Sequence, residues 1–135
     1  MNDVIISKIS IIQRCVKRAR EEYSLAAGNF ADDYTRQDAA SANVTRACEA
    51  AIDIANALIR IKKLGVPNSS GESFAILQRE GILSGELTEK MKRMVGFRNL
   101  AIHAYDKMEI QIFKEVITQH LDDLLAFTQI IAKSS

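Results

Sequence analysis

Apolar residues recur every three or four positions along most of this chain, the spacing that places them on one face of an α-helix. The first such segment runs from about Asp3 to Ala27, with Asn2 or Asp3 as its cap and Gly28-Asn29 at its end. Its apolar positions are Val4, Ile5, Ile9, Ile12, Val16 and Ala19. The pattern predicts a long helix at the N-terminus.

A second segment, from about Arg36 to Leu64, predicts another long helix. Thr35 is its candidate cap, and Gly65 followed by Pro67 provides the signal that ends it. Small side chains form a stripe along it, which lets a neighbouring helix approach closely. The stripe consists of Val44, Ala47, Cys48, Ala51, Ala55 and Leu58.

The C-terminal half predicts three further helices after a loop over residues 67–71. A short one spans about Glu72 to Arg79, and a longer one starts at a Ser84 cap and ends near Ala104 to Lys107. The last pattern begins at Asp106 and extends to residue 132 through Ile110, Phe113, Val116, Ile117, Leu121, Leu124 and Phe127.

The patterning predicts an all-α fold, an antiparallel bundle of four long helices plus a short one, because no useful strand alternation occurs. A chain of 135 residues fits one domain, 1–135, and 47% apolar with 26% charged residues is typical of a soluble globular protein. Lys and Arg total 18 against 17 Asp and Glu, so a global basic field for nucleic acid is excluded and any such contact must be local.

The sequence also indicates the cellular compartment. No apolar run approaches the length of a membrane span, and the N-terminus has no signal-peptide pattern. Cys15 and Cys48 lie within helical patterns, without the neighbours of a metal site, and are interpreted as reduced core residues. We expect a cytoplasmic protein.

Two charged groups leave alternatives open. Arg14, Lys17, Arg18 and Arg20 form either a solvated helix face or a local nucleic-acid contact. The second group lies on the predicted second helix, with its residues three or four positions apart. It either forms a ladder of surface ion pairs or supplies a carboxylate that orients Arg98 or His103. It consists of Arg46, Glu49 and Asp53.

The most unusual stretch runs from Gly96 to Tyr105, near the end of the helix that is predicted to start at the Ser84 cap. On a helix, Arg98 falls in the middle of an apolar stripe, where a permanently charged guanidinium needs an anionic partner, a water-lined cleft or an interface. The stripe consists of Leu87, Met91, Met94, Val95, Ile102 and Tyr105. Asn99 and His103 share a neighbouring flank.

Histidine and arginine together suit metal-free cleavage of RNA. The histidine can take a proton from the 2′-hydroxyl, while the arginine stabilises charge that develops on the phosphorus centre. Arg98 and His103, however, differ by about 140° around a continuous helix and by about 7.5 Å along it. Either the helix breaks before His103, or a second protomer completes the site.

The segment Arg98-Asn99-Leu100-Ala101-Ile102-His103 resembles the signature of the HEPN superfamily, and its continuation to Tyr105 resembles HepT-type toxins. The resemblance implies a homodimeric, metal-independent endoribonuclease toxin without a cofactor, whose partner is a minimal nucleotidyltransferase antitoxin. It implies that Arg98 and His103 are catalytic and that Asn99 orients the phosphate or the histidine. Tyr105 would receive AMP from the antitoxin.

Two other function classes remain open. The same cleft could bind a nucleotide, RNA or a partner without cutting, or the chain could be a helical adaptor in which Arg98 forms an interface salt bridge and His103 caps a helix. His120 lies on the apolar stripe of the last pattern and is interpreted as structural, and Met91 and Met94 are interpreted as packing residues.

Overall fold

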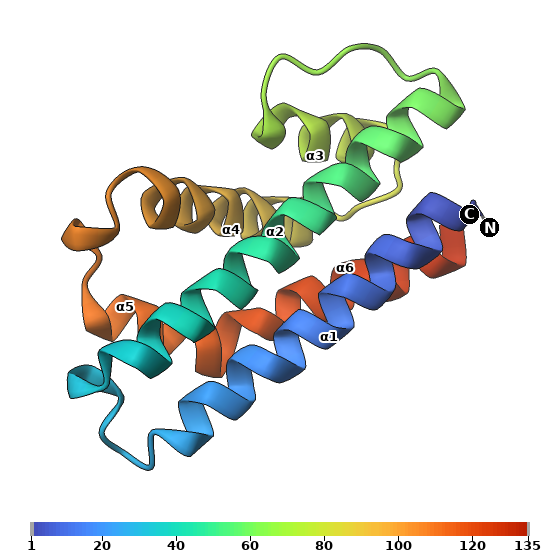
Figure 1. The fold of residues 1–135 in the computed structure, drawn as a ribbon. Helices are drawn as coiled ribbons and strands as arrows, with labels where there is room; N and C mark the ends of the chain where they lie inside the picture. The colour runs from blue at the N-terminus through green and yellow to red at the C-terminus, as the bar shows by residue number, and fades with distance from the viewer. Residues whose placement is uncertain (1, 135) are drawn as a thin grey trace.

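The computed structural model describes residues 2–134, and Figure 1 shows their helices as a bundle. No residue in that range lies in a strand, which confirms the all-α class. Three-residue 3₁₀ turns cover Phe30–Asp32 and Tyr105–Lys107, and a π-helical segment, Val116–His120, joins the last two helices. The α-helices are α1 Asp3–Leu25, α2 Tyr34–Lys62, α3 Ser70–Arg79, α4 Gly85–His103, α5 Ile110–Glu115 and α6 Leu121–Ser134.

The long helices pack as an antiparallel bundle, as the patterning predicts. α1 and α2 form the most extensive helix pair, and α6 runs back beside α1 so that the start of α1 and the end of α6 lie at the same end of the molecule (Figure 1). α4 contacts both α2 and α6, and α3 packs against α2 and α4. The end of α4, which carries the unusual stretch, therefore lies over α2.

The small-residue stripe of α2 is buried throughout. Val44, Ala47 and Ala55 have no exposed surface, and Cys48, Ala51 and Leu58 are nearly as inaccessible. Short side chains allow two helix axes to approach closely, and the extensive α1–α2 contact follows from that. Cys15 and Cys48 are both buried free thiols, as predicted.

Capping confirms two predicted helix starts and corrects a third. Asn2 Oδ1 accepts hydrogen bonds from the backbone N–H groups of Val4 and Ile5 at 2.8 and 3.3 Å, and Ser84 Oγ accepts from Leu87 at 3.1 Å. For α2 the prediction of Thr35 is wrong. Asp33 Oδ1 accepts from the N–H of Arg36 at 3.1 Å, so the helix starts earlier than the pattern suggested.

The end of α2 is also earlier than predicted. Lys63, rather than Gly65, takes the left-handed conformation with φ of 56°, and its N–H bonds back to the carbonyls of Ile59 and Arg60. That conformation closes the last turn, a role that glycine fills most often. Gly65 follows in the loop with φ of 123°.

Because of aromatic packing, α4 buries a face that differs in part from the apolar stripe predicted for it. The ring of Phe113 lies 5.3 Å from that of Phe30 and 5.6 Å from that of Phe97, which is only 7% exposed. Ile102, predicted to be buried, is 46% exposed. Because residues five apart differ by about 140° around a helix, burying Phe97 turns Ile102 outward. Met91 and Met94 are buried, as expected of packing residues.

The last helical pattern is interrupted rather than continuous from Asp106. Tyr105–Lys107 is a 3₁₀ turn, α5 begins at Ile110, and the π-helical segment separates it from α6. His120, expected on the apolar stripe, has a side chain that is 43% exposed and lies 3.7 Å from Asp123. An inserted π turn shifts the helical register, which explains why the apolar periodicity failed there. Within residues 2–134 no helix has the length and apolarity needed to cross a bilayer.

Candidate functional site

Arg98 projects from α4 into a half-buried position between helices. Its Nη2 donates a hydrogen bond to Ser70 Oγ at 3.3 Å, at the start of α3. Its Nε is buried and has no hydrogen-bond partner among residues 2–134. No carboxylate in that range pairs with the guanidinium, which leaves a water-lined cleft, an interface or an anion from outside the chain to accommodate its charge.

The buried thiol of Cys48, on α2, is a close neighbour of Arg98. Burial raises the pKa of the Cys48 thiol to about 12, and the positive charge of Arg98 only partly opposes that effect. The thiol is therefore protonated and neutral near pH 7. Cys48 does not serve as the missing counterion of Arg98.

Asn99 and His103 lie at the surface near the end of α4. Both side chains are exposed, and neither makes a hydrogen bond or ion pair within the part of the chain that the structure describes. α4 continues unbroken to His103, so the predicted alternative of a break before His103 is wrong. Arg98 and His103 consequently point about 140° apart, and the protomer does not bring them together.

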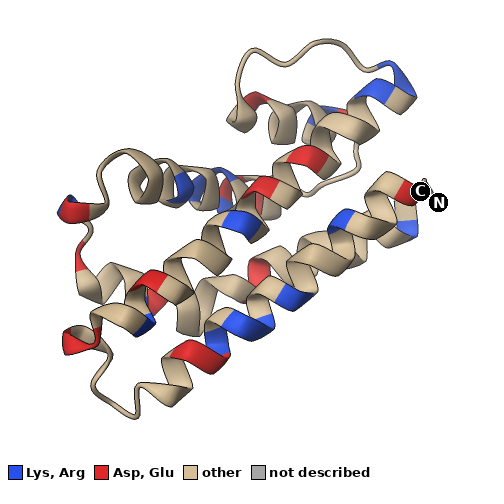
Figure 2. Cartoon of the chain, viewed as in Figure 1, with Lys and Arg blue, Asp and Glu red and all other residues tan. Residues whose placement is uncertain are grey.

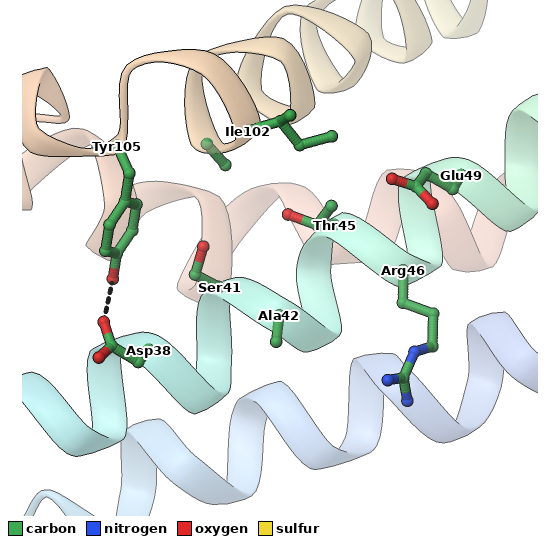
Figure 3. A pocket seen from close by; sticks show the side chains of 9 residues that line it. Asp38, Ser41, Ala42, Thr45, Arg46, Glu49, Ile102 and Tyr105 are labelled. Carbon is green, nitrogen blue, oxygen red and sulfur yellow. Dashed lines mark hydrogen bonds between the residues drawn. The ribbon is translucent and has the colours of Figure 1, made fainter.

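Tyr105 lies beyond the end of α4. Ala104 has φ of −151° and ψ of 47°, which ends the helix before the 3₁₀ turn begins. The phenol then points to α2, where Tyr105 Oη donates to Asp38 Oδ1 at 3.0 Å (Figure 3). The expectation that Tyr105 continues the helical stripe on which Arg98 lies is wrong, because α4 ends at His103, before Tyr105.

A hollow of about 510 Å³ opens beside Tyr105, between α2 and the end of α4. Figure 3 shows polar side chains of α2 on one side of it and Ile102 on the other. The sequence analysis singled out Arg46 and Glu49 among the α2 residues of this hollow and missed the others, although they recur at helical spacing. Its lining consists of Asp38, Ser41, Ala42, Thr45, Arg46, Glu49, Ala101, Ile102 and Tyr105.

The environment keeps the Tyr105 phenol protonated. Burial and the hydrogen bond and negative charge of Asp38 raise its pKa to about 12, while Ser41 acts in the opposite direction. At neutral pH the hydroxyl is therefore a hydrogen-bond donor, and it uses that capacity on Asp38.

The second charged group on α2 does not form an ion-pair ladder. Asp53 pairs instead with Lys8 of α1 at 3.0 Å. Arg46 and Glu49 make no ion pair among residues 2–134, and both line the hollow beside Tyr105. None of these side chains forms a hydrogen bond or ion pair with Arg98 or His103 in the described residues 2–134, so the structure does not show a carboxylate that orients either one.

The sequence pattern of the ribonuclease HepT-like family matches residues 12–131 of the chain. The chain belongs to this family. It is 41% identical over 131 residues to the mRNA nuclease HepT of Shewanella oneidensis, which covers 97% of this chain and 98% of that one. The resemblance to HepT-type toxins is thereby confirmed.

Solved structures agree with this HepT-like assignment over the whole chain. The AMPylated Shewanella oneidensis HEPN toxin, solved in complex with its MNT antitoxin, has a TM-score of 0.94 at 41% identity, with all of both chains covered. A toxin–antitoxin complex with AMP-PNP also has a TM-score of 0.94, at 40% identity over 99% of this chain and 100% of that one. The match to the HEPN toxin fold therefore extends over the whole of this chain.

In the HepT-like chain, the four predicted site residues lie in different surroundings. Arg98 is half-buried between helices, whereas Asn99 and His103 are exposed on the last turns of α4. Tyr105 is tied to α2 through Asp38. A single protomer thus presents the parts of a site without assembling them.

Proposed function

We propose that this chain is a metal-independent endoribonuclease and the toxin of a toxin–antitoxin pair of type II or VII character. Its identity of 41% to an mRNA nuclease across nearly its whole length supports the assignment. The single observation that carries it is Arg98, a half-buried guanidinium whose Nε lacks any partner among residues 2–134. An RNA phosphate supplies the negative charge and the paired acceptor oxygens that match the planar N–H donors of a guanidinium.

The proposed roles follow from the chemistry of the side chains. Arg98 binds the scissile phosphate and stabilises the charge that develops on it during attack. His103 takes the proton from the 2′-hydroxyl, since an imidazole titrates near neutral pH. Asn99, one turn before His103, orients the phosphate or the imidazole through its amide.

The proposed enzyme is a homodimer, because the unbroken α4 keeps Arg98 and His103 apart within one protomer. A two-fold axis near the end of α4 lets His103 of one protomer approach the phosphate held by Arg98 of the other. The exposed side chain of Ile102, between the two residues in sequence, provides apolar surface for such a contact.

Tyr105 is the proposed site of neutralisation. A minimal nucleotidyltransferase antitoxin transfers AMP from ATP, so that a bond forms between Tyr105 Oη and the α-phosphorus, pyrophosphate leaves and the phenolic proton is released. The ester removes the donor that now bonds Asp38 and adds a bulky anion next to that carboxylate. Toxin, antitoxin and RNA meet in the cytoplasm in this proposal, where the buried free thiols of Cys15 and Cys48 stay reduced.

A ribonuclease assay with EDTA present tests the proposal, with His103→Ala as the control. The enzyme should cut RNA with EDTA present and lose that activity in the variant, without loss of helical content. A non-catalytic RNA- or nucleotide-binding module is the second candidate, favoured by the separation of Arg98 from His103 within the protomer. That alternative predicts RNA that is bound and left intact.

Incubation with the antitoxin and ATP tests the modification separately. Mass spectrometry should find added AMP on the peptide that contains Tyr105, and Tyr105→Phe should escape modification. AMP on a different residue alone would refute the role of Tyr105 and leave the ribonuclease proposal standing.

A further inference from the structure

A second hollow, of about 520 Å³, lies between α1 and α2 on the face that carries the basic residues of α1. Figure 2 shows Lys and Arg gathered along the middle of α1, with a basic segment of α2 beside them. We call this hollow the α1–α2 groove. Its lining consists of Arg14, Cys15, Lys17, Arg18, Glu21, Asn43 and Arg46.

The cations of the α1–α2 groove are largely unneutralised. Arg14, Lys17 and Arg46 are exposed and make no hydrogen bond or ion pair within residues 2–134, whereas Arg18 pairs with Glu22 at 3.3 Å. Glu21 is the one carboxylate in the lining. On a chain with a net charge of only +1, three free cations around one hollow form a local site for anions.

Outside the groove, some basic side chains are paired with carboxylates, and others, like Arg60 and Lys62 near the end of α2, are without a partner among residues 2–134 but absent from the lining of this hollow. Several of them are paired with carboxylates: Lys8 with Asp53, Arg20 with Asp122, Arg36 with Glu22, Lys90 with Glu86 and Lys92 with Glu89. The positive charge of the α1–α2 groove therefore remains available to a ligand from solution.

We propose that the α1–α2 groove binds the sugar-phosphate backbone of the RNA substrate, with Arg14, Lys17 and Arg46 as its phosphate contacts. This proposal rests on the ribonuclease function proposed above. Guanidinium and ammonium groups bind phosphate through charge-assisted hydrogen bonds, whereas the lining offers no aromatic ring on which a base could stack. The groove consequently binds RNA without regard to base sequence.

RNA fits the α1–α2 groove better than an acidic protein does. Stable protein interfaces centre on apolar or aromatic anchors, and the lining contains none besides the buried thiol of Cys15. A phosphate backbone, by contrast, needs only a row of cations.

Arg46 connects the α1–α2 groove to the proposed site. Arg46 lines both this groove and the hollow that contains Tyr105 and Ile102, and its guanidinium points toward α1 (Figure 3). A strand held by Arg14 and Lys17 continues past Arg46 toward the end of α4. AMP on Tyr105 would project into the adjoining hollow and obstruct that path.

Salt dependence of binding provides the test. The probe is a fluorescent single-stranded 2′-O-methyl RNA, which keeps the phosphates and lacks the hydroxyl needed for cleavage, and binding is followed by anisotropy with the full chain. Arg14→Gln/Lys17→Gln should lower affinity for all sequences alike. It should also reduce the slope of log K against log salt by about 1.4, since each single-strand phosphate contact contributes about 0.7.

The matched control is Arg60→Gln/Lys62→Gln, which removes the same two types of charge from exposed positions at the far end of α2. It should leave affinity and slope close to those of the unchanged chain. Circular dichroism establishes that both double variants are folded.

The outcomes separate this proposal from the ribonuclease function. An unchanged slope for Arg14→Gln/Lys17→Gln, or equal losses in both double variants, would overturn the groove assignment. Loss of antitoxin binding with RNA binding unchanged would overturn it as well and identify a protein interface. Whether the unchanged chain cuts ordinary RNA is measured independently, and a negative result there would refute the enzyme.

Discussion

Tyr105 Oη donates a hydrogen bond to Asp38 Oδ1 at 3.0 Å across 67 residues of chain. The bond ties the 3₁₀ turn that follows the Arg98–His103 segment to the second turn of α2. Burial and this bond raise the pKa of the phenol to about 12, and the phenol lies at the edge of an open hollow. The residue proposed to receive AMP is thus held in position by the toxin itself.

Asp38→Asn should lower the pKa of Tyr105 from about 12 toward its ordinary value of 10. Asparagine keeps an acceptor oxygen and loses the negative charge that disfavours the phenolate. The pKa should not fall all the way to 10, because burial is the largest cause of the shift. A spectroscopic titration of tyrosinate, with Tyr105→Phe subtracted in each background, measures it, and an unchanged pKa would contradict the electrostatic account.

The stabilising effect of Tyr105 should depend on pH. Its folded pKa of about 12 lies above the ordinary value of 10, so folding favours the protonated phenol. The stabilisation is complete below pH 10 and is lost as the pH rises toward 12. Urea unfolding of the unchanged chain and Tyr105→Phe should show a constant difference in free energy below pH 10 that shrinks above it.

Arg98→Ala should separate stability from activity. Removing a half-buried guanidinium whose Nε is unpartnered should change the free energy of unfolding by no more than about 1 kcal/mol, in either direction. RNA cleavage should fall by about 100-fold or more, because no cation then stabilises the negative charge that develops on the phosphate during attack. Chemical denaturation and a cleavage assay on the same preparation measure both effects.

Arg36→Ala is the matched arginine control for that experiment. Arg36 bonds the carboxylate of Glu22 at 2.7 Å, and Glu22 is only 4% exposed. Its loss should destabilise the fold, since the buried carboxylate of Glu22 then keeps only Arg18 as a charged partner. Cleavage per folded molecule should be preserved. A large loss of stability in Arg98→Ala would contradict the separation of stability from activity.

The two histidines should respond differently to replacement. His103→Ala should reduce cleavage by about 10²–10⁴-fold, the usual contribution of a general acid or base. His120→Ala should retain activity, because His120 lies on the π-helical segment beside Asp123. Equal losses in both variants would show that His103 has no special role in the reaction.

Ile102→Glu should convert the proposed dimer into monomers and abolish cleavage together with dimerisation. Ile102 is 46% exposed between Arg98 and His103, and a carboxylate there opposes burial against a second copy. Sedimentation velocity reports the mass, and the cleavage assay reports the activity. A fully active monomer would refute a site built from two protomers.

Local physics made most of the fold predictable. Helical periodicity, the caps at Asn2 and Ser84 and the buried stripe from Val44 to Leu58 all depend on residues within a few positions of one another. The error in the cap of α2 was local as well. Asp33 and Thr35 are both capping residues, and only the path of the chain before α2 decided between them.

The amino-acid sequence by itself determined an all-helical chain, its small-residue seam, and the family signature from Arg98 to Tyr105. Only the tertiary structure decided what stands opposite each side chain: Ser70 beside Arg98, Asp38 beside Tyr105, and Arg46 across from Arg14 and Lys17. Those contacts join segments far apart in sequence, and they depend on how whole helices pack and on where α4 ends. The periodicity of a single helix predicts neither how whole helices pack nor where α4 ends.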